Sequence, residues 1–393
     1  MNKLWEYRKI GDVCVVERGG SPRPIDKFIT VDEDGINWIK IGDTSDSMYI
    51  TETAQKIIPE GMKKSRYVKP GDFLLSNSMS FGRPYILKID GCIHDGWLVL
   101  RDEQEFFDKR FLYYYLSSKT TYEKFRSMAV GGVVNNLNSE MVRKVEVPVP
   151  SKTEQSDIAD LLDGLKQVLD SRKKELQLLD ELIKARFVEM FGNPDINEKK
   201  WNEYKMEQLC EVGSSKRIYQ NDQSLTGIPF LRISDLVNRM DTGSKGCDLF
   251  IPEELFGKLK KQGLVPVRGD ILLTARGTLG RCYIIQDEDE FYFQDGMITW
   301  LSKYDERITP LYISYLFEMP GFRKQIDSLQ AGSTVAYLSI SMTKKLNVMT
   351  PPIELQNQFA DFVRAVDKSK VAVQKTLEQT QTLFDSLMQK YFG

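Results

Sequence analysis

The chain lacks the features of a secreted or membrane protein. It contains no apolar run near the ~20 residues of a membrane span, and its start, MNKLWEYRK, has no signal-peptide core. The five cysteines are odd in number and include no C-x-x-C pair, which favours reduced structural thiols over disulfides or zinc. The sequence therefore predicts a cytoplasmic protein that has no membrane span and holds no metal.

Signatures of catalysis are also missing. There is no G-x-x-x-x-G-K-[ST] phosphate loop, no G-x-G-x-x-G after a strand, and no Asn/Asp-Pro-Pro-Tyr/Phe methyltransferase motif. Asp195 and Glu198 imitate a nuclease cluster, but they stand too close in sequence to lie on adjacent strands, so a solvated linker is favoured. The only histidine, His94, has no second histidine with which to share a metal, and a structural role is favoured. The sequence predicts a chain that is not an enzyme.

An excess of positive charge is missing as well. The chain holds 54 Lys and Arg against 56 Asp and Glu, and the two charges are nearly balanced both in residues 1–150 and in residues 193–350. A protein that binds DNA alone by neutralising phosphates is usually basic. If this chain contacts DNA, much of the positive charge must be local or be supplied by partners.

What the sequence does contain is an internal repeat. VRGDILLTARGTLGRCYII at 267–285 aligns without a gap with KPGDFLLSNSMSFGRPYIL at 69–87, at an offset of 198. The repeat continues along the chain, so one unit of roughly 195 residues occurs twice. The other matched segments are 37–43 with 229–235, 94–97 with 294–297, 129–132 with 330–333, 150–155 with 351–356, and 190–192 with 391–393.

Each unit has a mixed part followed by a helical part. Short β-rich runs with Gly-rich breaks precede a predicted amphipathic helix, at 111–128 and again at 311–329, where Met319-Pro-Gly321 interrupts it. A Gly-rich loop and a Pro-marked strand follow. The sequence predicts an α/β (α+β) globule in residues 1–150 and another in 193–350, alternating with long helices in 151–192 and 351–393.

The two long helices carry apolar residues at alternating spacings of four and three. A single such stripe also fits an amphipathic helix that lies on its own globule. Two equal stripes over five heptads favour helix-on-helix pairing, and a helix of about 37 residues is roughly 55 Å long. If the globules dock at opposite ends, the helices form an antiparallel coiled coil with a pseudo-twofold axis. The seam is Ile158, Leu162, Leu165, Leu169, Leu176, Leu179 and Ile183 with Phe359, Val363, Val366, Val373, Leu377, Phe384 and Leu387.

The repeated Gly-Arg stretches at 80–84 and 277–281 lie between apolar runs, which is typical of hairpin connections. Two interpretations are open. The glycines satisfy turn geometry and the arginines are solvated, or the glycines let the backbone approach DNA while hydroxyl groups and arginines contact phosphates or base edges. The flanks match and the tips differ, so two modules on one scaffold should bind different sequences.

Basic residues recur at matched places and complete the set of candidates. A charge run is usually a solvated face, but its return near Lys63 and Lys260 favours phosphate contacts. The candidate DNA-binding residues are Lys40, Lys63, Lys64, Arg66, Ser78, Arg83, Asn135 and Asn136 in the first unit, and Arg232, Lys260, Lys261, Arg276, Thr278, Arg281, Ser333 and Thr334 in the second.

In this order of segments the chain resembles the specificity subunit of type I restriction-modification enzymes. The resemblance covers essentially the full chain and is carried by residues 150–155 leading into Ile158, by residues 351–356 leading into Phe359, and by the matched Gly-Asp-x-Leu-Leu and Gly-Arg stretches. The first turn departs from the usual Pro-Pro because it reads Pro150-Ser151.

The resemblance implies a non-catalytic subunit in which each globule is a target recognition domain for one half of a bipartite, asymmetric double-stranded DNA target. The helices would set the spacer and dock two modification subunits, which are adenine methyltransferases. Restriction subunits would add a motor endonuclease. It implies no cofactor on this chain, and S-adenosylmethionine, ATP and Mg on the partners.

Two alternatives stay open at this point. The chain is a coiled-coil scaffold that binds proteins without contacting DNA, or it serves a system whose methylation and cleavage reside in one partner polypeptide. A scaffold would show no salt-sensitive DNA binding when assembled.

Overall fold

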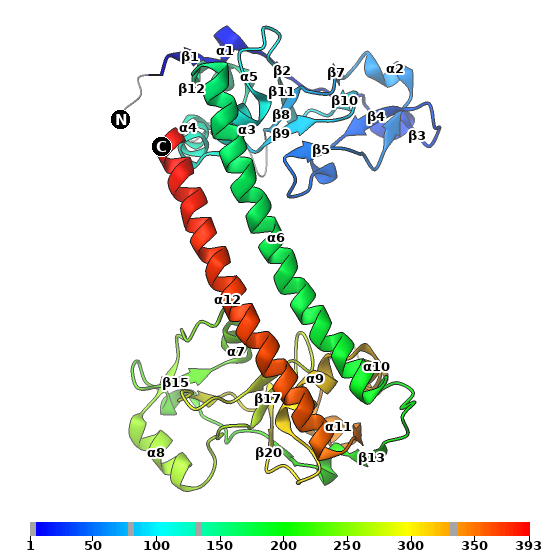
Figure 1. Cartoon of the computed structure of the whole chain (residues 1–393), viewed down its shortest axis with the longest axis vertical. Coiled ribbons are helices and arrows are strands. Elements are labelled where there is room, and N and C mark those ends of the chain that lie inside the picture. The colour runs from blue at the N-terminus through cyan, green and yellow to red at the C-terminus, as the bar shows by residue number, and fades with distance from the viewer. Residues whose placement is uncertain (1–4, 78–81, 130–135, 331–335) are drawn as a thin grey trace. The chain divides into compact units, whose positions relative to one another are not determined.

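The computed structural model describes residues 5–77, 82–129, 136–330 and 336–393, which fold into two compact units (Figure 1). Unit 1 comprises Met1–Lys173 with Lys375–Gly393, and unit 2 comprises Lys174–Gln374. Each unit contains one globule together with parts of both long helices. Four candidate residues lie outside the described residues: Ser78, Asn135, Ser333 and Thr334.

The globule of unit 1 is built on two five-stranded sheets and a two-stranded ribbon. The sheets have the orders β2-β11-β8-β9-β5 and β3-β6-β4-β10-β7, and the ribbon pairs β1 with β12. Strands β8 and β9 form an antiparallel hairpin, whereas β4 and β10 are parallel. The strands are β1 (Tyr7–Lys9), β2 (Val15–Arg18), β3 (Ile29–Thr30), β4 (Ile36–Ile39), β5 (Tyr49–Ile50), β6 (Lys56–Ile57), β7 (Arg66–Val68), β8 (Phe73–Ser76), β9 (Pro84–Leu87), β10 (Gly91–Ile93), β11 (Trp97–Arg101) and β12 (Glu146–Pro148).

The globule of unit 2 repeats the ribbon and the central strand pairings of unit 1, on a four-stranded and a three-stranded sheet. Its sheets have the orders β14-β20-β17-β18 and β16-β15-β19, and its ribbon pairs β13 with β21. Again one hairpin, β17-β18, is antiparallel, and one pair, β15 with β19, is parallel. The internal repeat predicted from the sequence is therefore present in the fold. The strands are β13 (Asn202–Lys205), β14 (Glu211–Gly213), β15 (Ile228–Leu231), β16 (Phe250–Ile251), β17 (Ile271–Thr274), β18 (Cys282–Ile284), β19 (Tyr292–Phe293), β20 (Ile298–Ser302) and β21 (Asn347–Thr350).

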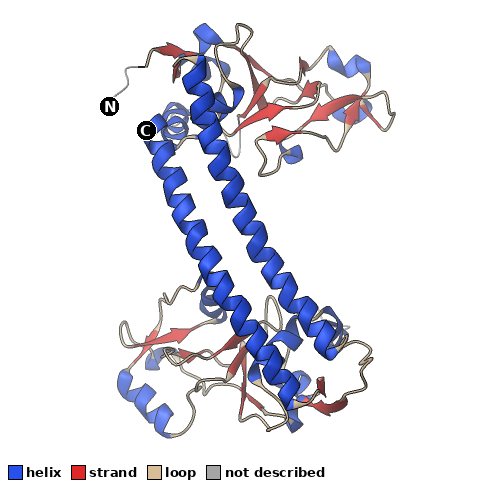
Figure 2. Ribbon diagram, in the orientation of Figure 1, coloured by secondary structure: helices blue, strands red, loops and turns tan. Residues whose placement is uncertain are grey.

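Each unit contains both helices and strands, as expected for the α/β (α+β) class (Figure 2). In unit 1, side chains of α3 such as Phe111 join a buried cluster with Phe73 of β8, and in unit 2 Tyr312 of α9 joins a cluster with Ile271 of β17. The helices are α1 (Ile10–Val13), α2 (Pro59–Met62), α3 (Lys109–Ser117), α4 (Lys119–Ala129), α5 (Ser139–Lys144), α6 (Lys152–Phe191), α7 (Ile233–Thr242), α8 (Glu253–Lys261), α9 (Pro310–Glu318), α10 (Pro320–Leu329), α11 (Ile340–Lys344) and α12 (Ile353–Phe392).

The helix predicted over 111–128 is in fact two helices, so that expectation was wrong. The backbone of Ser118 is extended between α3 and α4, and its hydroxyl oxygen accepts a hydrogen bond from the N–H of Thr121 at 3.2 Å. Ser118 thus begins α4 in the way that a serine cap begins a helix. The break expected near Met319 is present, because α9 ends at Glu318 and α10 begins at Pro320.

One buried glutamine at the start of each long helix ties that helix to its globule. Gln356 is 1 % exposed; its amide nitrogen donates to the carbonyls of Arg307 (2.8 Å) and Pro351 (2.9 Å). Its amide oxygen accepts from the N–H of Thr309 at 2.9 Å. Gln155 makes the same contacts in unit 1, with the carbonyls of Phe106 and Pro150 and the N–H of Asp108. The glutamine shared by the two Pro-marked turns is therefore structural.

Parts of α6 and α12 pair antiparallel in unit 2. Phe187 and Phe191, near the end of α6, contact Phe359, near the start of α12, with ring centroids 5.5 Å and 5.4 Å apart. Farther from these ends, the Asp180 carboxylate pairs with the Lys370 ammonium at 2.6 Å. Because the α6 number falls as the α12 number rises, the two segments run in opposite directions.

Each seam residue predicted from the sequence is buried or half-buried. Buried seam residues in unit 2 include Ile183 and Phe359, which share one cluster, and in unit 1 Ile158 and Leu162 share a cluster with Phe392. The remaining buried positions are Leu169, Val363, Val366 and Val373, and the half-buried ones are Leu165, Leu176, Leu179, Leu377, Phe384 and Leu387. Within the described residues, no helix is long and apolar enough to cross a membrane.

Candidate nucleic-acid interface

Three loops meet at one edge of the central sheet in each unit. They are the start of the hairpin connection at Asn77 or Ala275, the Asp-Gly loop that leads into β11 or β20, and the segment after the Gly-rich loop at Leu137 or Leu338. In unit 1 the Asn77 N–H donates to the Gly96 carbonyl at 3.0 Å, and the Leu137 N–H donates to the Asn77 carbonyl at 3.0 Å. In unit 2 Ala275 bonds in the same way to Met297 and Leu338, both at 2.9 Å.

The glycine in the repeated Gly-Arg stretch is needed to close the hairpin. Gly82 and Gly280 have φ values of +81° and +72°, which side-chain-bearing residues rarely adopt. A Cβ on Gly82 would lie 3.0 Å from the Phe125 ring, and one on Gly280 would lie 3.2 Å from Phe317. The turn and its packing therefore both require these glycines, and contact with DNA is not needed to explain them.

The arginine of that stretch is held by an aspartate of the same unit, which lies in a loop in unit 1 and in the last turn of α7 in unit 2. Arg83 pairs with Asp46 at 3.4 Å, and Arg281 pairs with Asp241 at 2.6 Å. The hydrogen bond from Arg281 lowers the pKa of Asp241, which keeps that carboxyl ionised. Each pair links the hairpin to the segment that follows β4 or β15, so part of the arginine's charge is neutralised within the chain.

Several other candidate cations also have partners within the chain. Arg232 contacts Asp235 at 3.0 Å and Asp248 at 3.1 Å. The other contacts join Arg66 to Glu17 at 3.3 Å, the Lys40 ammonium to the Gln55 side chain at 2.8 Å, and the Lys64 ammonium to the Phe28 ring at 5.3 Å from its centroid. These contacts do not exclude DNA, but they make the side chains less available than the sequence suggested.

The remaining candidates differ in their positions. Arg276 is exposed at the hairpin tip of unit 2, and its guanidinium lies 5.3 Å from the centre of the Tyr337 ring, which belongs to the end of the Gly-rich loop. Thr278 is exposed on the same tip, and Asn136 is half-buried beside Leu137. The exposed lysines Lys63, Lys260 and Lys261 lie at the ends of α2 and α8.

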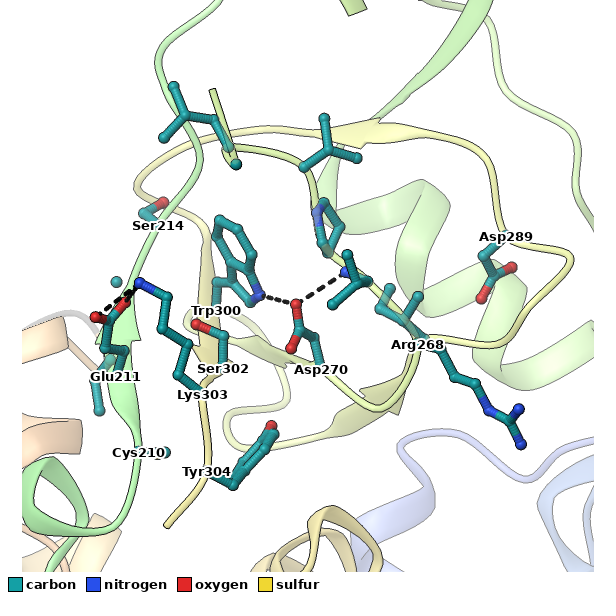
Figure 3. Close-up of a pocket in the computed structure, with 18 of the residues that line it drawn as sticks. Cys210, Glu211, Ser214, Arg268, Asp270, Asp289, Trp300, Ser302, Lys303 and Tyr304 are labelled. Atoms are coloured by element: carbon teal, nitrogen blue, oxygen red, sulfur yellow. Dashed lines mark hydrogen bonds and ion pairs between the residues drawn. The ribbon is translucent and has the colours of Figure 1, made fainter. Parts of the chain in front are cut away.

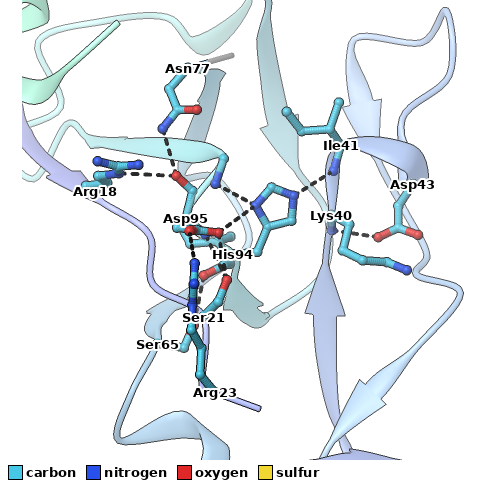
Figure 4. A network of polar contacts seen from close by, with 12 residues as sticks. Arg18, Ser21, Arg23, Lys40, Ile41, Asp43, Ser65, Asn77, His94 and Asp95 are labelled. Carbon is cyan, nitrogen blue, oxygen red and sulfur yellow. Dashed lines mark hydrogen bonds and ion pairs between the residues drawn. The ribbon is translucent and has the colours of Figure 1, made fainter. Parts of the chain in front are cut away.

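A polar network around the Asp-Gly loop was missed in the sequence (Figure 4). In unit 1 the Ser21 hydroxyl donates to Asp95 at 2.8 Å, and Arg23 pairs with the same carboxylate at 3.2 Å. The hydrogen bond from Ser21 lowers the pKa of Asp95, so the carboxyl is charged at neutral pH. In unit 2 Arg217 pairs with Asp295 at 2.8 Å. The available signal was the repeat of Ser-x-Arg at 21–23 and 215–217.

His94 supports this loop structurally (Figure 4). Its Nδ1 atom accepts a hydrogen bond from the Gly96 N–H at 2.6 Å, which fixes the neutral ring in one orientation. Burial lowers the pKa of His94. In unit 2 Gln294 takes this place, and the backbone N–H of each residue bonds to the preceding parallel strand, at Ile39 or Leu231.

A large cavity in unit 2 is unsuited to DNA (Figure 3). It has a volume of about 1570 Å³ and is lined by acidic residues in excess of basic ones. Its acidic residues include Glu211, which pairs with Lys303 at 2.9 Å, and Asp270, which accepts a hydrogen bond from the Trp300 indole at 2.9 Å. The negative lining would repel a polyanion.

Comparison with known proteins agrees with this architecture. Residues 2–181 and 198–380 each match the family model described as "Type I restriction modification DNA specificity domain". A putative type I restriction enzyme specificity subunit of Haemophilus influenzae is 27% identical over 73% of this chain and 71% of that protein. The EcoKI specificity subunit of Escherichia coli is 23% identical over 99% of this chain and 88% of that protein.

Solved structures show the same fold. The S subunit of a type I restriction-modification system from M. genitalium is 16% identical and has a TM-score of 0.54, with 100% of this chain and 97% of that chain covered. A chain from a study of assembly and conformational transition in a type I R-M system is 15% identical and has a TM-score of 0.62, with 99% and 97% covered.

The chain is a duplicated α/β module with two long helices, and it shares this fold with the S subunit from M. genitalium. The two matched domains account for nearly the whole chain. The chain belongs to the type I restriction modification DNA specificity domain family, and it is the DNA-recognition subunit of such a system.

Proposed function

We propose that the chain reads one bipartite, asymmetric DNA target, with residues 1–150 and 193–350 as target recognition domains that each bind one half. The observation that carries the proposal is the three-loop edge, which has the same backbone hydrogen bonds in both units but different side chains at its tips. One scaffold that presents two different sets of side chains suits two different half-sites.

The helices in 151–192 and 351–393 set the spacer between the half-sites and dock two modification subunits. The buried Gln155 and Gln356 support this role, because they fix each helix to a globule. The seam pairing supports it as well, because it joins segments of the two helices. The chain itself is non-catalytic. Adenine methylation with S-adenosylmethionine, and ATP- and Mg-dependent translocation and cleavage, belong to the modification and restriction subunits of a complex that acts on cytoplasmic DNA.

A base-resolved methylation map of the host, with and without this gene, tests the proposal. Loss of one bipartite, asymmetric adenine motif upon deletion is the expected result. A deletion strain that keeps every motif, although the cognate methyltransferase is active, would reject the proposal in favour of a protein-binding scaffold. A near-palindromic motif would reject the asymmetry.

Changing helix length tests the spacer role. Removing one heptad from each long helix should shorten the spacer between the half-sites and leave the half-site sequences unchanged, because the seam pattern repeats every seven residues. The map of the variant strain measures both quantities at once. Altered half-sites with an unchanged spacer would contradict the assignment of these helices.

A further inference from the structure

The paired arginines Arg23 and Arg217 occupy equivalent positions in the two units. Each follows a serine by two residues, and each forms an ion pair with the aspartate of the Asp-Gly loop, Asp95 or Asp295. Their side chains are 81% and 64% exposed, respectively. The two ion pairs therefore place one exposed guanidinium beside the three-loop edge in each unit.

Each aspartate orients its arginine without occupying all of the guanidinium. Arg23 contacts Asp95 through Nη2, and Arg217 contacts Asp295 through Nε. Among the described residues, these are the side chains to which the two guanidinium groups donate. A guanidinium carries five N–H donors in a fixed fork, so donors are left for a second acceptor such as a phosphate oxygen.

The aspartates are themselves held in place. Besides its bond from Ser21, Asp95 accepts at its backbone carbonyl from the Asn77 amide at 2.7 Å and from Arg18 at 3.2 Å. In unit 2 the Ser214 hydroxyl oxygen accepts from the N–H of Gly296, next to Asp295, at 3.3 Å. The orientation of each arginine is thus set by the Asp-Gly loop, which also bonds to Asn77 or Ala275 at the start of the hairpin connection.

Residues that are the same in both units should contact the part of DNA that is the same in both half-sites. Every duplex presents the same phosphate backbone, whereas the bases of two different half-sites differ. Arg276 shows the opposite behaviour, because it lies at the tip of unit 2 and its aligned position in unit 1 is Ser78. Repeated residues therefore suit phosphate contacts, and tip residues that differ suit base contacts.

We propose that Arg23 and Arg217 are a matched pair of DNA-phosphate contacts that set each recognition domain on the backbone, independently of sequence. The proposal rests on the proposed function and deepens it, because it assigns positioning to these arginines and leaves base reading to the tips. Such a contact contributes to binding of any duplex. Without it, DNA binding releases about one counterion fewer.

Arg23→Gln and Arg217→Gln variants of the full chain, each co-purified with its modification subunits, test the proposal. The matched control is Arg268→Gln, because the Arg268 side chain is similarly exposed and pairs with Asp287 at 2.9 Å but lines the acidic cavity. Fluorescence anisotropy gives the dissociation constant for the duplex defined by the methylation map and for a scrambled duplex, over a series of NaCl concentrations.

Each arginine variant should weaken binding to both duplexes by the same factor. The plot of the logarithm of the association constant against the logarithm of the salt concentration has a negative slope, and this slope should become less steep by about 0.9. The control should match the wild type. Weaker binding to the target duplex alone would make the arginine a base contact and overturn the proposal, as would an unchanged slope. A wild-type complex that binds neither duplex would instead reject the proposed function.

Discussion

Replacing Gln356 with methionine should loosen unit 2 and leave unit 1 unchanged. The side chain is buried and bonds to the backbone of Arg307, Thr309 and Pro351, which belong to the loop before α9 and to the turn before α12. Methionine has a similar volume, so the change removes hydrogen bonds without opening a large cavity.

The magnitude follows from the contacts that are lost. Gln356 donates two hydrogen bonds and accepts two, from the N–H and the hydroxyl of Thr309. At about 1 kcal/mol net for each bond, the free energy of unfolding of unit 2 should fall by about 4 kcal/mol. Because 1.4 kcal/mol is a factor of ten, the opening equilibrium should increase nearly a thousandfold.

Hydrogen exchange read by mass spectrometry reports each unit separately. Amides of β17 and β20 should exchange faster in the variant, while amides of β8 and β11 should keep their wild-type rates. Gln155→Met should give the reverse pattern, because Gln155 makes the equivalent contacts in unit 1. Gln358→Met, at an exposed position of the same helix, is the control for side-chain replacement.

Two results would refute this reasoning. Equal, small effects of Gln356→Met and Gln358→Met would show that the buried amide contributes no net stability. Equal loosening of both units would show that the units do not unfold separately, so the division of the chain would not describe its cooperativity.

Two further predictions use the repeat as an internal control. Phe392→Ala should lower the free energy of unfolding of unit 1 by about 3 kcal/mol and speed thiol labelling of Cys14, which shares its buried cluster, but not of Cys210 in unit 2. Phe191→Ala should destabilise unit 2 instead and speed labelling of Cys210 but not of Cys14. Faster labelling of both cysteines in either variant would contradict this. Because burial lowers the pKa of His94, the native state favours the neutral ring, so unit 1 should lose stability as the pH falls below about 6.5 towards that lowered pKa. His94→Gln, which copies Gln294, should remove this loss in urea denaturation at pH 7.5 and 5.5, and an identical pH dependence in both proteins would reject the cause.

The features that the sequence predicted well are those carried by local patterns. The duplication, the long helices and the alternation of mixed and helical segments follow from identities at fixed offsets and from apolar periodicity. Even the missed helix break had a local signal, because Ser118 precedes Thr121 by the spacing of a serine cap. That signal was outweighed by the amphipathic pattern on both sides of it.

The features that the sequence did not predict depend on contacts between distant residues. The ion pairs of Arg83 with Asp46 and of Arg23 with Asp95 join residues that are 37 and 72 positions apart. No periodicity ranks one aspartate above another as a partner, so the sequence indicated neither ion pair. Only the pairing of strands brings the Asp-Gly loop beside residues 21–23.

The discontinuity of unit 1 has a consequence for how the protein is made. Its globule is synthesised first, but Phe392, which contacts Phe111 and Tyr115, comes from the end of α12. At about 5–20 residues per second, the roughly 200 residues of unit 2 take tens of seconds to synthesise. During that interval the aromatic face of α3 remains exposed on the nascent chain. The globule that leaves the ribosome first is therefore the last to close, and it is the one that most needs protection from aggregation.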